Sequence, residues 1–412
     1  MKKFLALTLA LVMSLSLVAC GDKKTDDTKT DAPDQTEQPA ENEGAYKVAM
    51  ITDYGDITDQ SFNQTTYEAC KAFAEDNSIE FSYFRPAGDN TADRVAMIEK
   101  AVDEGFNVIV MPGYAFGGAI VEAAPEFPDV KFIALDVAAG DLLETAVAKA
   151  GEAYDYTPEN WDLNKYVDMS NVYCAVYQEE LCGYMAGYAA VKLGYKNLGF
   201  LGGMSVPAVV RYGYGFVQGV DAAAADLGLT DVKLNYIYGG QFFGDADITA
   251  VMDTWYQGGT EVVFACGGGI YTSAVDAAKK VGAKVIGVDV DQAGVIANYA
   301  GVDGMTVTSA MKGLYPATYD TLTDVIVNGN WEKYVGKIET LGLVSGTDPE
   351  ANYVQIPMGD GTQWSDSFTQ DDYKAMVKDM FDGKITVSND VSKAPSDFAT
   401  VIAVEDQGAI KG

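Results

Sequence analysis

Short apolar runs alternate with segments of helical periodicity along the chain from about residue 46 onward. The first run, residues 46–52, predicts a buried strand, and Asp59 is placed to cap the helix that follows. Further apolar runs predict strands at residues 81–84, 108–111, 130–135, 172–176, 198–201, 233–237, 262–265 and 285–288. Strands that alternate with helices in this way indicate βαβ units and parallel sheets.

Two segments of similar length repeat the same pattern. Residues 105–136 and 259–289 each read as a strand, a turn containing glycine, a helix and a second strand that ends in an aspartate. Two similar lobes facing each other would place Asp136 and Asp289 at carboxyl ends of strands, where open α/β sheets bind ligands. The repeat therefore predicts a two-lobed clamp, with the polar stretch 138–170 as an irregular insertion.

The first residues of the chain predict export and lipidation. Residues 4–19 form an apolar run, too short for a membrane span, that follows the positive Met1-Lys2-Lys3 start. The run ends in Leu17-Val18-Ala19-Cys20, the pattern of a lipobox, and the alternative is an ordinary secretory signal with an incidental cysteine. We expect residues 1–19 to be the signal peptide and residues 20–45, nearly all polar and charged, to be a lipidated, disordered tether.

Composition narrows the chemistry that is possible. The formal net charge of −32 disfavours nucleic acid and anionic ligands, so a neutral or cationic small molecule is the easier partner. The chain has no histidine, which excludes a histidine-based catalytic triad and a histidine metal ligand. The remaining cysteines lie in apolar segments without a CxxC pair, and we interpret them as buried free thiols: Cys70, Cys174, Cys182 and Cys266.

Two loops resemble a cofactor site and a metal site in composition, but the spacing of their residues does not match either kind of site. The turn Gly267-Gly268-Gly269 opens a helix, but GxGxxG spacing is absent there and no P-loop pattern occurs in the chain. The acidic loop 52–64 carries three aspartates without the alternation and final glutamate of a calcium loop. We therefore expect neither a cofactor nor a metal.

Six segments, in order, resemble one known family. TDYGDITDQSFNQ, PDVKFIALD, EELCGYMAGYAA, LGFLGGMSVPAVVRYGYGFVQGV, GVDVDQ and TSAMK are similar to the basic membrane protein family, lipoproteins that bind purine nucleosides for ABC-type importers. The resemblance covers about residues 46–312 and implies an α/β fold of the type I periplasmic-binding class. That fold has two Rossmann-like lobes, a three-stranded hinge and a ligand cleft between the lobes. We expect a first lobe of residues 46–175 with a return segment at about 306–335, and a second lobe of residues 176–305 with a segment at about 336–412.

The resemblance also implies the binding residues. In the family, two phenylalanines sandwich the purine, while acidic and lysine side chains hold the polar edges and the ribose. The matching positions in this chain are Asp53, Phe62, Asn63, Asp136, Phe242, Gly268, Asp289 and Lys312. The chain departs from the pattern in its longer 138–170 stretch, in the Phe242-Phe243 doublet and in Arg211, which could reach the cleft.

These observations predict a monomeric, lipid-anchored extracellular binding protein and not an enzyme. Its expected partners are a nucleoside, an ABC permease and, through Cys20, the membrane, but no nucleic acid. A monosaccharide receptor of the same fold is the alternative among binding proteins. A secreted nucleosidase that uses the aspartate cluster, and a sensor that signals its bound state, remain as other classes.

Overall fold

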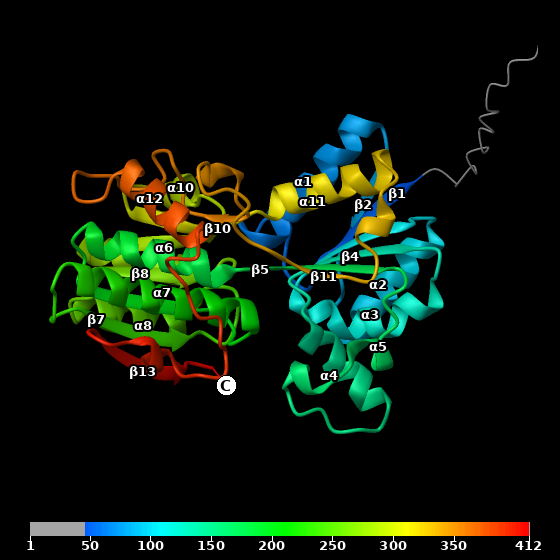
Figure 1. The fold of residues 1–412 in the computed structure, drawn as a ribbon, viewed down its shortest axis with the longest axis horizontal. Coiled ribbons are helices and arrows are strands. Elements are labelled where there is room, and N and C mark those ends of the chain that lie inside the picture. The colour runs from blue at the N-terminus through cyan, green and yellow to red at the C-terminus, as the bar shows by residue number, and fades with distance from the viewer. Residues whose placement is uncertain (1–45, 412) are drawn as a thin grey trace, which may run out of the picture. The chain divides into compact units, whose positions relative to one another are not determined.

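The computed structural model describes residues 46–411 and shows two parallel sheets covered by helices (Figure 1). The first sheet has the order β11-β5-β4-β3-β1-β2, all parallel. Its strands are β1 (Lys47–Ile51), β2 (Glu80–Phe84), β3 (Val108–Pro112), β4 (Lys131–Leu135), β5 (Val172–Tyr177) and β11 (Ile338–Leu341). The helices of this first lobe are α1 (Phe62–Asn77), α2 (Thr91–Asp103), α3 (Gly117–Ala123), α4 (Ala139–Lys149), α5 (Leu163–Tyr166) and α11 (Leu314–Leu322).

The second sheet has the order β12-β10-β9-β8-β6-β7-β13 and is parallel except for the β10–β12 pair. Its strands are β6 (Asn197–Gly202), β7 (Lys233–Tyr238), β8 (Val262–Cys266), β9 (Lys284–Asp289), β10 (Thr306–Lys312), β12 (Val354–Gln355) and β13 (Ala403–Ala409). The helices of the second lobe are α6 (Glu179–Lys192), α7 (Pro207–Asp226), α8 (Ala246–Gln257), α9 (Tyr271–Val281), α10 (Ala293–Ala300) and α12 (Gln370–Phe381). Short 3-10 turns occur at Tyr114–Phe116, Ala124–Glu126, Pro158–Asn160, Trp331–Lys333, Pro349–Ala351 and Pro395–Phe398, and a π turn at Thr323–Val327.

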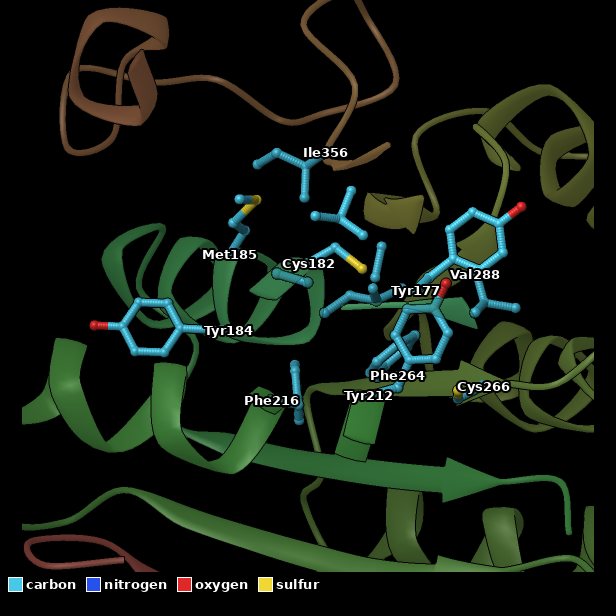
Figure 2. Packing of buried hydrophobic residues seen from close by; sticks show 14 of the residues in the cluster. Tyr177, Cys182, Tyr184, Met185, Tyr212, Phe216, Phe264, Cys266, Val288 and Ile356 are labelled. Carbon is cyan, nitrogen blue, oxygen red and sulfur yellow. The ribbon is translucent and has the colours of Figure 1, made fainter. Parts of the chain in front are cut away.

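The central strands are apolar along their whole length because helices cover both faces of each sheet. All five residues of β3 and all five of β8 are buried. Figure 2 shows this packing in the second lobe, where Tyr212 from α7 and Phe264 from β8 lie together. Their rings make an edge contact with 5.9 Å between centroids.

Both lobes repeat one strand order, which confirms the predicted repeat. The first lobe contains the series β2-β1-β3-β4-β5 and the second contains β7-β6-β8-β9-β10. In such a sheet the strand order reverses between β1 and β3, or between β6 and β8. The loops that leave these two neighbouring strands separate to opposite faces of the sheet and form a crevice. The loops after β1 and β3 in one lobe, and after β6 and β8 in the other, are therefore the natural walls of a binding site.

Three crossings join the lobes and are hydrogen-bonded to one another. The chain crosses after β5, after β10 and between β11 and β12. Gln178 N donates to Leu341 O over 3.0 Å, and Gly313 N donates to Tyr353 O over 2.7 Å. These bonds tie the three segments into the expected three-stranded hinge.

Two lobe boundaries differ from those that the sequence predicted, because the chain crosses between the lobes at other residues. The expected return segment at 306–335 was wrong in its first part, because β10 pairs with β9 in the second sheet and the chain reaches the first lobe only at α11. Helix α11 then packs against α1 (Figure 1). Strand β11, assigned by the prediction to the second lobe, pairs with β5 in the first sheet.

The stretch 138–170 is not the irregular insertion that was expected. This stretch contains helix α4, whose buried side chains are Leu142, Leu143, Ala146 and Val147, and the short helix α5. The predicted signal peptide, Cys20 and the tether lie outside the described residues. Among residues 46–411, no helix is both long and apolar enough to span a bilayer.

Candidate ligand-binding site

A cavity of about 450 Å³ lies between the two lobes, at the carboxyl ends of their strands. The loops after β1, β3 and β4 line it from one side, and those after β6, β7, β8 and β9 from the other. All of the binding residues that the sequence predicted line this cavity: Asp53, Phe62, Asn63, Asp136, Phe242, Gly268, Asp289 and Lys312. Arg211, whose reach the sequence left open, lines it as well.

The loop after β1 holds Asp53 and Asn63 through local hydrogen bonds. Asp53 Oδ1 accepts from Tyr54 N at 2.6 Å and from Gly55 N at 2.7 Å, while burial raises the pKa of this carboxyl. Ser61 is the N-cap residue of α1, but the side chain of Asp59 accepts from Asn63 N and Gln64 N in the first turn and so caps the helix from two residues further back. This cap fixes the start of α1, where Phe62 and Asn63 face the cavity.

Two glycines at equivalent places in the two sheets let side chains approach the backbone. Gly113 follows β3 with φ 124° and Gly267 follows β8 with φ 143°. A Cβ atom on Gly267 would lie 2.7 Å from the ring of Phe242, and one on Gly203 would lie 2.3 Å from it. The Phe242 ring therefore rests directly on glycine backbone, whereas its neighbour Phe243 is 56% exposed.

Asp136 and Asp289, the last residues of the two repeats, occupy matching conformations and meet at Lys312. Their φ angles are 59° and 65°, in the left-handed region, at the carboxyl ends of β4 and β9. Lys312 Nζ lies 2.5 Å from Asp136 Oδ2 and 3.9 Å from Asp289 Oδ1. The ammonium group also lies 4.8 Å from the centre of the Phe62 ring.

The lysine is buried and stays charged. Burial by itself would lower the pKa of Lys312, but the carboxylates of Asp136, Glu179 and Asp289 more than offset it, so the pKa is raised. Burial raises the pKa of Asp136, and the nearby lysine opposes this.

Glu179 is the main site residue for which the sequence gave no role. It is fully buried at the start of α6, where Oε1 lies 3.4 Å from Lys312 Nζ and Oε2 accepts from Arg211 Nε at 2.7 Å. The segment EELCGYMAGYAA carried the family resemblance, but nothing in its pattern marks the first glutamate as the link between two cations. Tyr177 and Tyr212 complete the wall around the lysine, with ring centres 5.3 and 5.6 Å from Nζ. Figure 2 shows these two rings close together.

Two buried oxygens of cavity-lining residues, Asn63 Oδ1 and Asp136 Oδ1, accept no hydrogen bond from the described residues 46–411. Buried polar atoms normally have a partner, so these two oxygens are candidate acceptors for hydrogen bonds from a ligand. The carboxyl side chains that line the cavity outnumber the cations: the acids are Asp53, Asp56, Asp59, Asp136, Asp141 and Asp289, and the cations are Arg85, Arg211 and Lys312. This charge balance suits a neutral or cationic ligand.

Hydrogen bonds connect the lobes across the cavity. Ser61 Oγ of the first lobe donates to Asp289 Oδ2 of the second over 2.5 Å. Gln292 Nε2 donates to Gln60 O over 3.1 Å. Within residues 46–411 no group of acidic or cysteine side chains is arranged to hold a metal ion, and the four cysteines are buried free thiols as predicted.

Two lobes of one strand order, three hinge crossings and a cavity at both crevices define the type I periplasmic-binding fold. A solved ABC transporter solute-binding protein from Aeropyrum pernix K1 shares it, with a TM-score of 0.59 and 19% identity over 86% of this chain and 90% of that one. This likeness confirms the expected fold.

Residues 46–347 match the family described as ABC transporter substrate-binding protein PnrA-like (Bmp). Among its relatives is the ABC transporter nucleoside-binding protein BmpA of Lactococcus lactis, 25% identical over 94% of this chain and 99% of its own length. A lipoprotein of Pyrococcus abyssi is 25% identical over 82% of this chain and 74% of its own length. The chain belongs to the Bmp family and is an ABC transporter solute-binding protein.

Proposed function

We propose that the protein binds purine nucleosides in the interlobe cavity and presents them to an ABC permease, without turning them over. The observation that carries this proposal is the arrangement around Lys312. A buried ammonium group lies between two aspartates and beside the Phe62 ring, in a cavity that Phe242 also lines. Polar groups for a sugar and flat apolar rings for a base are thus found in one cavity.

The two phenylalanines provide the surfaces for the base. Phe62 comes from the first lobe and Phe242 from the second, so closure of the lobes on a planar ring would bury both of its faces. Stacking of a base on an aromatic side chain is worth roughly 1–3 kcal/mol. Asp53 and Asn63 are the polar groups of the first lobe that could accept from the edge of the base.

Asp289 and Lys312 provide the groups for the ribose. The Asp289 carboxylate already accepts two hydroxyls, those of Ser61 and Tyr212. A ribose diol offers two hydroxyl donors of the same kind, and Lys312 can donate to its oxygens in turn. The unpartnered Asp136 Oδ1 adds a further acceptor.

The charge balance of the cavity favours nucleosides over nucleotides. A phosphate would enter a wall with more carboxylates than cations, and Lys312 is already engaged by Asp136 and Glu179. The named activity of the Lactococcus lactis relative, nucleoside binding, supports the same ligand class.

Titration calorimetry of the ligand-free protein tests the site. Guanosine and inosine should bind, and Phe62→Ala or Phe242→Ala should weaken binding of the nucleoside and of the free base alike, by about ten- to hundredfold. Asp289→Ala should weaken only the nucleoside, since the base lacks the diol. Asp231→Ala, a carboxylate that pairs with Lys196 at the surface, is the matched control and should leave affinity unchanged.

Two results would contradict the assignment. A hexose that binds more tightly than any nucleoside would support the monosaccharide receptor instead. Release of free base in proportion to protein would support a nucleosidase.

The lipobox and the lipoprotein relatives support a location of the protein at the membrane. We propose that Cys20 is acylated and tethers a monomer to the outer face of the membrane, as the lipoprotein name of the Pyrococcus abyssi relative suggests. A Cys20→Ala variant should leave the membrane fraction or stay uncleaved. Unchanged partitioning of that variant into detergent would contradict the anchor.

A further inference from the structure

The loop at residues 239–245 carries Phe242 into the cavity, and its inner side is held by the core of the second lobe. Gly239 N donates to Gly202 O over 2.7 Å, and Gly269 N donates to Phe242 O over 2.9 Å. These bonds fix the backbone on the side of β6 and β8. They leave the outer side of the loop to be held by other residues.

The outer side is held by the segment that follows β13. Ile410 N donates to Tyr238 O over 2.8 Å, which extends the pairing of β13 with β7 up to the start of the loop. Gly240 has φ 81°, and a Cβ atom there would lie 2.5 Å from Lys411 O. The glycine thus allows the backbone at Lys411 to lie directly against the loop.

The side chain of Lys411 then joins both ends of the loop. Its ammonium group donates to Gln241 Oε1 at 3.2 Å and also to Asp245 Oδ2. Gln241 Nε2 in turn donates to Phe243 O and to Asp245 Oδ2, each over 2.9 Å. Asp245 caps α8 through Ile248 N, so the network connects the loop to a helix of the lobe.

We propose that Lys411 is a positioning residue that holds the 239–245 loop so that the Phe242 ring stays seated against Gly203 and Gly267. Lys411 itself does not line the cavity, and it acts on the ligand only through Phe242. The Bmp family match ends at residue 347, so this support comes from a part of the chain beyond the matched region. The proposal rests on the proposed function in one respect, since it takes Phe242 to be a stacking surface.

Lys411→Met tests the proposal by two readouts. Hydrogen exchange should become faster at the amides of residues 239–245, in the absence of any ligand. The dissociation constants of guanosine and guanine should both rise by about two- to fivefold, the range of a partly exposed ion pair. Lys411→Arg retains donors for both acceptors and should behave like the parent protein.

A matched control and a double variant separate positioning from general stability. Lys384→Met removes an ion pair with Asp379 that lies outside the loop and should change neither readout. In a Phe242→Ala background, Lys411→Met should cause no further loss of affinity, because the ring through which it acts is gone.

Parent-like exchange in residues 239–245 of Lys411→Met would overturn the proposal. An equal loss of affinity in the parent and the Phe242→Ala background would also overturn it. If Phe242→Ala alone left affinity unchanged, the proposed ligand site would fail, while the exchange result would still decide whether Lys411 holds the loop.

Discussion

Removal of the Lys312 ammonium group should destabilise the protein more than any surface substitution. Lys312→Met keeps the length of the side chain but removes the counter-charge of Asp136 and Asp289, while Glu179 keeps only its pair with Arg211. At an effective dielectric constant of about 20, unit charges at these separations of 2.5–3.9 Å attract by roughly 4–7 kcal/mol each, before desolvation is subtracted. Because desolvation offsets much of that attraction, we expect a net loss of about 3–5 kcal/mol at pH 8.

The loss should depend on pH in a definite direction. Burial raises the folded-state pKa of Asp136 above its unfolded value, and removal of the lysine takes away the charge that opposes this. An acid whose pKa is higher in the folded state than in the unfolded state destabilises the folded state increasingly as pH rises from its unfolded-state pKa to its folded-state pKa. The difference between Lys312→Met and the parent should therefore be largest at pH 8 and shrink towards pH 5.

Urea unfolding followed by tryptophan fluorescence at both pH values measures this difference, once bound ligand has been removed. Lys374→Met, which breaks an exposed pair with Asp371, should cost less than about 1 kcal/mol. Adding Asp136→Asn to Lys312→Met should recover part of the loss. A loss below about 1 kcal/mol at pH 8, or an equal loss at both pH values, would refute the account of this buried cluster.

Three further predictions concern other parts of the site. Burial raises the pKa of Asp141 to about 7, so the ionisation of this side chain disfavours folding as pH rises from about 4 to 7. Asp141→Asn should therefore stabilise the protein by roughly 1–3 kcal/mol at pH 8 but not at pH 4, as urea titrations would measure. Gly267→Ala should cost about 1–3 kcal/mol of stability and displace Phe242. Gly294→Ala, in α10 with open space around the added methyl group, is the control and should not destabilise the protein. Equal unfolding midpoints for the two variants would show that the Gly267 backbone is not constrained. Incubation with inosine should release no hypoxanthine above the level of a protein-free control, as chromatography of the mixture would show.

The local pattern of the sequence predicted much of the fold, because strand and helix signals are short-range. The repeats 105–136 and 259–289 correctly indicated two similar lobes, and their final aspartates do meet. The sequence assigned β10 to the first lobe and β11 to the second, whereas the structure has them the other way round. Sheet membership could not be predicted here because it depends on the hinge, which brings together segments distant in sequence. Helix α4 was missed because its N-cap residue is Ala138, which leaves Asp141 in the first turn as the only polar signal of its start.

The candidate site was predictable where it coincided with family motifs and unpredictable where it depends on tertiary contacts. All eight expected residues line the cavity, but their binding of a nucleoside remains a prediction. Glu179 could not be identified because its partners Lys312 and Arg211 lie far from it along the chain. Similarly, the doublet Phe242-Phe243 became interpretable only when the structure placed the first ring on Gly203 and Gly267.

Mass spectrometry of the small molecule that co-purifies with the protein from cells tests the central claim most directly. The protein would be purified in native buffer, denatured, and its released ligand compared with that of the Phe62→Ala/Asp289→Ala double variant. We predict a purine nucleoside in the parent sample at close to one molecule per chain, and a strongly reduced amount in the variant. A sugar without a base, or a nucleoside retained equally by the variant, would contradict the proposed site.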